Sequence, residues 1–219
     1  LQPETVTIGE ALWHHWNQSA SDTMLIWLGG GVVEQTAFFI NPYEFESYNT
    51  MLFVQDLARH YDVLALAKGS TETLDPTLNR TMFREPYLRS DDFMEKIRRW
   101  ASANQYTYMY VVSYSVGAMV AAEELVLANP AGWTSPNGLI MITTKIPQAA
   151  ASRASSLRAS LLLLYGDRVR SDFTASGESF FQNAPEEAWA DTYWFHKEFH
   201  LIPDVEHEVW TVMDSGEYD

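Results

Sequence analysis

Ser115 lies where one apolar run ends and the next begins, with almost no loop between the two runs. The segment 108–118 reads YMYVVSYSVGA, and Ser115 lies where a β-rich run passes into a run with helical character. A strand that turns sharply into a helix pushes the side chain at the corner out of the sheet edge. The positions two residues before and after the corner must be small because the two backbones crowd together, and Ser113 and Gly117 satisfy this. The pattern predicts Ser115 as an exposed nucleophile.

Two further interpretations of this segment stay open. The match to G-x-S-x-G is incomplete because Ser113 replaces the first glycine, so Ser115 could simply cap the helix of an ordinary strand–helix turn. Ser113 is the weaker candidate for a nucleophile, since its +2 residue is another serine and it still lies within the expected strand. The backbone N–H of Val116 belongs to the first turn of the helix and points at the corner, where it would stabilise an oxyanion.

A histidine lies close to the end of the chain, after the last β-rich run. The segment 201–208 reads LIPDVEHE, with His207 between Glu206 and Glu208. A nucleophilic serine needs a base that accepts its proton and later protonates the leaving group, and histidine is suited to both steps. His207 is therefore a candidate for this base, and we expect the charges of Glu206 and Glu208 to raise its pKa.

The other pairs of histidines do not indicate a metal centre. His14 and His15 are adjacent in a run with strand character, so their side chains point to opposite faces. His196 and His200 stand four residues apart, a spacing that suits metal ligation on a helix, but their surroundings read as a strand. The chain has no cysteine, which excludes disulfides, thiolate catalysis and cysteine-bound metals. We therefore expect no metal site and no cofactor.

An alternation of short β-rich runs with longer helical runs must position these residues. The expected strands are 5–8, 12–16, 24–28, 61–67, 106–112, 139–143, 161–165 and 194–202. Helices are expected over 48–60, from residue 90 or 91 onward, over 116–128, and beginning within 179–183. Such an alternation predicts a mostly parallel sheet with helices on both faces, in which the chemistry gathers at the carboxyl ends of the strands.

Length, charge and composition limit the class of protein. The chain has 219 residues with no break in composition, which fits one domain spanning 1–219. The net charge of −15 provides no cationic surface to meet phosphates or an anionic membrane, so no nucleic-acid or membrane partner is expected. The longest apolar runs are too short to span a bilayer, and no signal peptide is visible, which favours a cytoplasmic location.

The serine corner and the order of the strands resemble the α/β-hydrolase superfamily over nearly the whole chain. That family has eight strands with the nucleophile after the fifth, and Ser115 follows the fifth expected strand. The resemblance implies a three-layer α/β/α sandwich around a mostly parallel, eight-stranded sheet. It also implies an oxyanion loop after the third strand, where this chain has three successive glycines without the usual histidine. Backbone amides act there, so Gly30 or Gly31 is the expected second donor, and a plain glycine-rich turn is the other interpretation.

The same resemblance assigns the remaining members of a catalytic triad. The family's acid follows the seventh strand and its histidine follows the eighth, which implies that His207 is the histidine. The usual Gly-x-x-Asp spacing after 161–165 falls on Val169, so the acid is displaced in this chain. Asp172 is the first candidate because it precedes the next expected helix by the usual interval, and Asp167 is the second.

Together these positions imply a serine esterase with a nucleophile elbow, a catalytic triad and an oxyanion hole. The expected substrate is a small or medium carboxylic ester, or a thioester, that is hydrolysed through an acyl-enzyme on Ser115. Only residues 145–159 separate the sixth and seventh strands, which leaves no room for a large lid, whereas the long polar loop 69–90 could cover the pocket. The alternative is a catalytically decayed relative that serves as a binding or scaffold protein, which the departures at Ser113 and Val169 would suit.

Overall fold

The computed structural model describes residues 2–9, 11–17, 21–29, 48–66, 93–127, 136–186, 196–207 and 209. The chain folds as two compact units, Leu1–Met109 and Tyr110–Asp219. A single domain over 1–219 therefore stays a prediction. The loop 69–90 lies outside the described residues. None of the helices in the described ranges is long and apolar enough to cross a bilayer.

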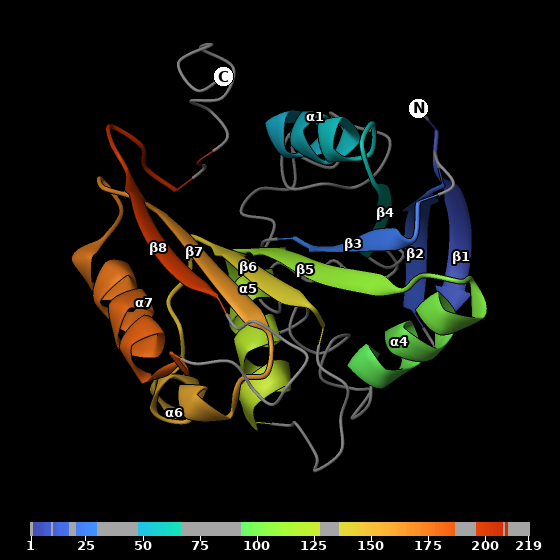
Figure 1. Cartoon of the computed structure of the whole chain (residues 1–219). Helices are drawn as coiled ribbons and strands as arrows, with labels where there is room; N and C mark the ends of the chain where they lie inside the picture. The colour runs from blue at the N-terminus through green and yellow to red at the C-terminus, as the bar shows by residue number, and fades with distance from the viewer. Residues whose placement is uncertain are drawn as a thin grey trace, which may run out of the picture. The chain divides into compact units, whose positions relative to one another are not determined.

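The first unit pairs a hairpin with two parallel strands. Its strands are β1 (Glu4–Ile8), β2 (Ala11–Trp16), β3 (Thr23–Leu28) and β4 (Asp62–Leu66), and its helices are α1 (Tyr48–Leu57) and α4 (Phe93–Ala103). Strand β2 is antiparallel to both β1 and β4, whereas β3 and β4 run parallel. The helices α1 and α4 lie on opposite faces of β3 and β4 (Figure 1), as expected for a sheet that buries both faces. Trp13, Trp16 and Trp27 fill its core at no more than 1% exposed.

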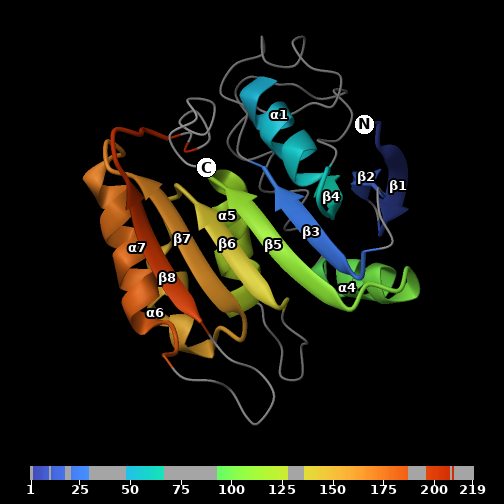
Figure 2. The same cartoon turned by 45° about the horizontal axis from the view of Figure 1, so that its top comes forward.

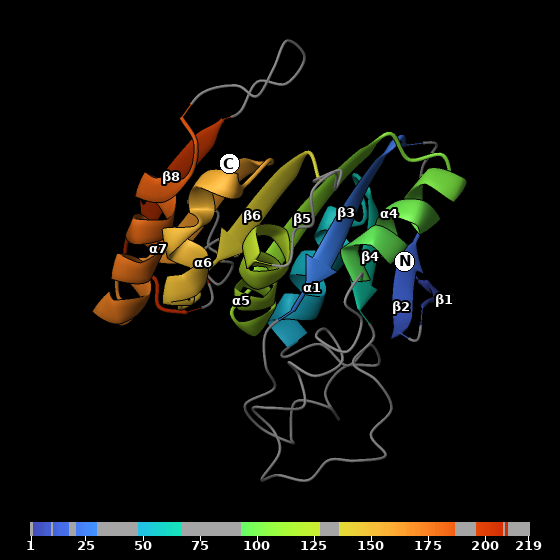
Figure 3. The ribbon, with the colours of Figure 1, turned by 90° about the horizontal axis from the view of Figure 1, so that it is seen from below.

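The second unit carries the predicted catalytic segments on four parallel strands. These are β5 (Tyr108–Tyr114), β6 (Gly138–Ile142), β7 (Ser160–Gly166) and β8 (Lys197–Ile202), each paired with the next. The helices are α5 (Val116–Ala122), α6 (Gln148–Ser152) and α7 (Ser171–Asn183). Figures 2 and 3 show these three helices on one face of the four strands. Since parallel strands end at one edge, the segments that follow β5, β6, β7 and β8 gather there.

The strand order confirms the predicted eight-stranded, mostly parallel sheet. The order is β1-β2-β4-β3-β5-β6-β7-β8, and every strand lies within a few residues of its predicted range. Strand β5 runs to Tyr114 instead of Val112, so Ser115 follows the strand directly. Helix α5 passes at its end into a π-helical turn, Glu123–Leu127, inside the helix predicted over 116–128.

The predicted start of α7 within 179–183 was wrong, because this helix begins at Ser171. Its first half, SDFTASGE, is rich in residues of low helix propensity and contains Gly177. Packing overrides that propensity, since a Cβ at residue 177 would lie 2.6 Å from the ring of Tyr165. The glycine lets α7 approach β7 closely. Because the helix begins at Ser171, Asp172 lies in its first turn.

Candidate active site

Ser115 alone connects β5 to α5. The strand ends at Tyr114 and the helix begins at Val116. The backbone of Ser115 has φ 52° and ψ −114°, a left-handed conformation that is sparsely populated by residues other than glycine. Such strain costs on the order of 1–3 kcal/mol and persists where the surroundings enforce it, often at functional sites. The hydroxyl does not cap α5, so the interpretation of Ser115 as a helix-capping serine is wrong.

Hydrogen bonds from β6 and β7 hold this corner. The N–H of Ser115 donates to the carbonyl oxygen of Ile142 at 3.0 Å, and the hydroxyl of Thr144 donates to the carbonyl oxygen of Ser115 at 2.7 Å. Tyr165 donates in turn to the carbonyl oxygen of Thr144 at 2.8 Å. Burial raises the pKa of Tyr165, so this phenol keeps its proton and stays a donor. Both polar backbone groups of Ser115 are thus fixed by neighbouring segments.

The two small residues around the corner are buried, as the motif requires. Ser113 is fully buried in β5, and its hydroxyl donates to the carbonyl oxygen of Ile140 at 2.8 Å. Its hydroxyl is therefore engaged within the sheet and not presented at the sheet edge. Gly117 is buried in the first turn of α5.

His207 lies against Ser115. Its Nε2 atom is 3.0 Å from the Oγ atom of Ser115, within hydrogen-bond distance. The imidazole ring lies 5.0 Å from the ring of Tyr114 and 6.1 Å from the ring of Phe173, measured between centroids. Half-burial among these groups lowers the pKa of His207, so the expectation that flanking glutamates raise it was wrong. Glu206 is exposed and points its charge into water, which screens it.

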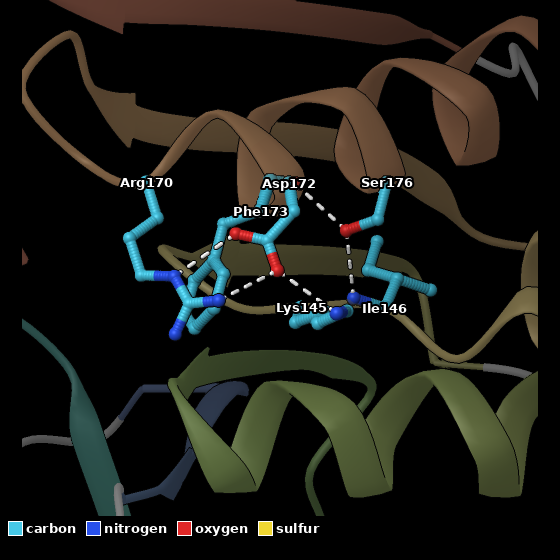
Figure 4. Close-up of polar contacts among 6 residues, drawn as sticks. All are labelled: Lys145, Ile146, Arg170, Asp172, Phe173 and Ser176. Atoms are coloured by element: carbon cyan, nitrogen blue, oxygen red, sulfur yellow. Dashed lines mark hydrogen bonds and ion pairs between the residues drawn. The ribbon is translucent and has the colours of Figure 1, made fainter.

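Asp172 is engaged by two cations (Figure 4). Its Oδ2 atom accepts from Lys145 Nζ at 2.9 Å, and Arg170 donates to Oδ1 and Oδ2 at 3.1 Å each. These hydrogen bonds, from Lys145 first and then from Arg170, lower the pKa of Asp172. The cluster anchors the start of α7 to the segment after β6, together with the hydrogen bond from the Ile146 N–H to the Ser176 hydroxyl at 2.9 Å.

The structure brings Ser115 and His207 together, and it does not bring either predicted acid to His207. Asp172 has the contacts above, and Asp167 is exposed, with its N–H donating to the carbonyl oxygen of Ile202 at 3.0 Å. In the described ranges no carboxylate is hydrogen-bonded to the His207 ring. The assignment of the acid to Asp172, or to Asp167, stays a prediction.

Of the three predicted oxyanion-hole donors, only Val116 lies in the described part of the chain. Val116 is the first residue of α5, and the N–H groups of the first turn have no acceptor within their own helix. Gly30 and Gly31 lie outside the described residues. The role of these three residues stays a prediction.

Thr143 is a feature of the site that sequence reasoning missed. It follows β6 directly, next to the corner in sheet register, since Tyr114 pairs with Ile142. It is fully buried with φ 37°, an unusual value for a β-branched residue. Its hydroxyl has no hydrogen-bond partner among the described residues. No pattern of residue types signals such strain.

His196 and His200 lie on one face of the β8 segment and share a partner. Their Nε2 atoms lie 2.5 Å and 2.6 Å from the two carboxylate oxygens of Glu198. Glu198 is thus the shared partner of both imidazoles. Within the described part of the chain, no group of three such side chains is placed to hold a metal ion.

Known structures share this architecture. A dienelactone hydrolase from Anabaena variabilis superposes with a TM-score of 0.65 at 14% identity, covering 99% of this chain and 95% of that one. A CIB-like hydrolase from Thermoplasma acidophilum gives 0.61 at 14% identity, covering 96% and 90%. An α/β serine hydrolase homologue from Coxiella burnetii gives 0.57 at 10% identity, covering 94% and 88%. The sequence itself matches no family model and no curated protein. The chain therefore has the α/β-hydrolase fold.

Proposed function

We propose that this chain is a serine hydrolase that cleaves small or medium carboxylic esters, or thioesters, through an acyl-enzyme on Ser115. The observation that carries the proposal is the 3.0 Å separation of Ser115 Oγ and His207 Nε2 at a strained strand–helix corner. A hydroxyl in contact with a neutral imidazole can lose its proton as it attacks. The lowered pKa of His207 keeps that imidazole neutral at neutral pH.

The reaction has two halves that use the same pair of residues. Ser115 Oγ attacks the carbonyl carbon while His207 Nε2 takes its proton, and the N–H of Val116 with that of Gly30 or Gly31 stabilises the oxyanion. The bond to the leaving oxygen or sulfur then breaks, and His207 returns the proton to the leaving group. Water attacks the acyl-enzyme with His207 again as base, which releases the acid and restores Ser115.

The acidic residue of the triad is not assigned. The sequence names Asp172 first and Asp167 second. For Asp172 to orient His207, its carboxylate would have to leave Lys145 or Arg170. The described contacts favour a Ser115–His207 pair that works without either carboxylate.

Structural neighbours and the short segment between β6 and β7 support a small substrate. One neighbour, EstE5, was studied after soaking with p-nitrophenyl butyrate, and another is an esterase/lipase from an uncultured bacterium. Only the segment with α6 and a short 3₁₀ turn separates β6 from β7, so no large lid is inserted there. p-Nitrophenyl butyrate is therefore a suitable first substrate.

One observation favours a second candidate, a binding or scaffold protein with a decayed site. Among the described residues no carboxylate contacts His207, as loss of catalytic constraint would produce. A decayed site keeps the fold but no activated serine.

Labelling with a fluorophosphonate probe separates the two candidates. Wild type should be labelled, Ser115→Ala should not, and Ser152→Ala should react like wild type because Ser152 is exposed on α6. Turnover of p-nitrophenyl butyrate should follow the same pattern. A folded wild type that is neither labelled nor active would exclude the hydrolase and leave the binding protein.

A further inference from the structure

The turn after β7 packs against the segment that carries His207. Gly166 is the last residue of β7 and pairs with Ile202 of β8. A Cβ at residue 166 would lie 2.1 Å from the carbonyl oxygen of Val205 and 2.2 Å from that of Glu206. Both atoms belong to the backbone and cannot rotate away. Only a residue without a side chain lets these two peptide groups lie where they do.

Backbone hydrogen bonds hold the same segment. The N–H of Asp167 donates to the carbonyl oxygen of Ile202, and that of Arg168 to the carbonyl oxygen of Val205, both at 3.0 Å. The side chain of Val205 is buried at 2% exposed. The backbone that leads to His207 is therefore held on the β7 turn at several successive points.

Charge contributes less to this arrangement than backbone packing. Arg168 forms an ion pair with Asp204, but both side chains are exposed. Exposed pairs contribute about 0–1 kcal/mol, because water screens them. The close approach at Gly166, in contrast, admits no adjustment by rotation of a side chain.

His207 has few other anchors. Its ring contacts Tyr114 and Phe173, and its Nε2 meets Ser115, but no carboxylate hydrogen bond orients it in the described part of the chain. We infer that Gly166 is a positioning residue for His207: by admitting the Val205–Glu206 backbone against β7, it sets the separation of the imidazole from Ser115. This inference rests on the proposed function for its catalytic consequence and on geometry for the position itself.

The test replaces Gly166 by alanine in the full chain, with Gly138→Ala as the matched control. Gly138 begins β6, and its added Cβ would lie 2.7 Å from the ring of the half-buried Tyr110, so it meets a side chain and not the backbone that leads to His207. In Gly166→Ala the new atom meets backbone and displaces His207. A displacement of about 1 Å costs about 10²-fold, so fluorophosphonate labelling and kcat for p-nitrophenyl butyrate should fall by that factor with KM nearly unchanged. Gly138→Ala should keep wild-type values.

A second readout does not depend on activity. The pKa of His207, followed by NMR titration of its ring protons, is held below the ordinary value by burial. Gly166→Ala should move the ring toward solvent and raise this pKa, whereas Gly138→Ala should leave it unchanged. An inactive wild type whose His207 responds in this way would overturn the hydrolase function and support the positioning role.

If Gly166→Ala does not fold, the variant Val205→Ala tests the same inference. It removes buried methyl groups beside the same backbone segment and adds no atom. Labelling should fall and the pKa of His207 should rise, each less than expected for Gly166→Ala. A folded variant of either kind with wild-type labelling and an unchanged pKa of His207 would overturn the inference.

Discussion

The Oγ atom of Ser115 lies 3.0 Å from the Nε2 atom of His207, although 92 positions separate the two residues in the chain. Ser115 directly follows strand β5 of the second unit, and His207 lies on the segment after that unit's edge strand β8. The two residues meet because each follows a parallel strand, and the carboxyl ends of parallel strands lie at one edge of the sheet. It makes His207 the first residue to test after Ser115.

Replacement of His207 by glutamine should abolish most of the reactivity of Ser115 without unfolding the chain. General-base catalysis contributes about 10²–10⁴-fold, so the rate of fluorophosphonate labelling should fall by that factor. His196→Gln is the control, because His196 is exposed and contacts Glu198 instead. Equal labelling of wild type and His207→Gln would show that another group activates the serine.

The pH dependence of labelling should report a histidine with a lowered pKa. Burial disfavours the charged imidazole, so His207 should remain neutral, and active as a base, to a pH below the ordinary titration range of histidine. The rate should rise with pH, with its midpoint below that range. A midpoint above the range would mean that a carboxylate contacts His207 in solution, because a nearby negative charge favours the protonated form.

Asp172→Asn tests the acid directly. Where a carboxylate orients the base of a serine hydrolase, replacement by the amide lowers turnover by about 10⁴-fold. The Asp172 carboxylate faces Lys145 and Arg170, so we expect labelling close to that of wild type. Asp167→Asn should behave in the same way because Asp167 is exposed. A steep loss in one variant alone would identify that residue as the acid.

The local part of this site could be predicted from the sequence. A strand–turn–helix corner needs particular residue types at adjacent positions, so Ser115, with small residues on either side of it, stands out in a single sequence. The place of His207 after the last strand followed from the order of the elements. These signals are local or topological, and both survive errors of a few residues in the element boundaries.

The remainder of the site depends on contacts between distant segments, which leave no local signal. Tyr114 and Phe173 lie in separate elements, β5 and α7, and both contact the ring of His207. The start of α7 was placed too late because Gly177 weakens the helical pattern, although its role is to admit Tyr165. The same error placed Asp172 before the helix, whereas it lies in the first turn of α7.

Thr143→Val should stabilise the protein. Valine keeps the β-branched shape and hence the strain at φ 37°, so the comparison isolates the buried hydroxyl. Burial of a hydroxyl without a partner costs about 1–3 kcal/mol, and the free energy of unfolding should rise by up to that amount in urea denaturation. Thr144→Val is the matched control and should destabilise, because its hydroxyl donates to Ser115. A loss of stability in Thr143→Val would show that a water, or a residue outside the described ranges, satisfies the hydroxyl.

Tyr106→Phe should destabilise the first unit. Tyr106 donates to the buried Asp62 at 2.8 Å and, with its hydrogen so engaged, accepts from Nε2 of the buried His15 at 3.0 Å. The other nitrogen of His15 lies 2.8 Å from a carboxylate oxygen of Glu4.

Burial and the hydrogen bond to Asp62 raise the pKa of Tyr106, so its hydroxyl keeps the proton that joins the two partners. Phenylalanine removes a donor and an acceptor from a buried network, at a cost of about 1–3 kcal/mol. The urea midpoint should fall in Tyr106→Phe and stay constant in Tyr108→Phe, since Tyr108 is 44% exposed. Equal midpoints for both variants would mean that water replaces the phenol at no cost, and that the network is open to solvent.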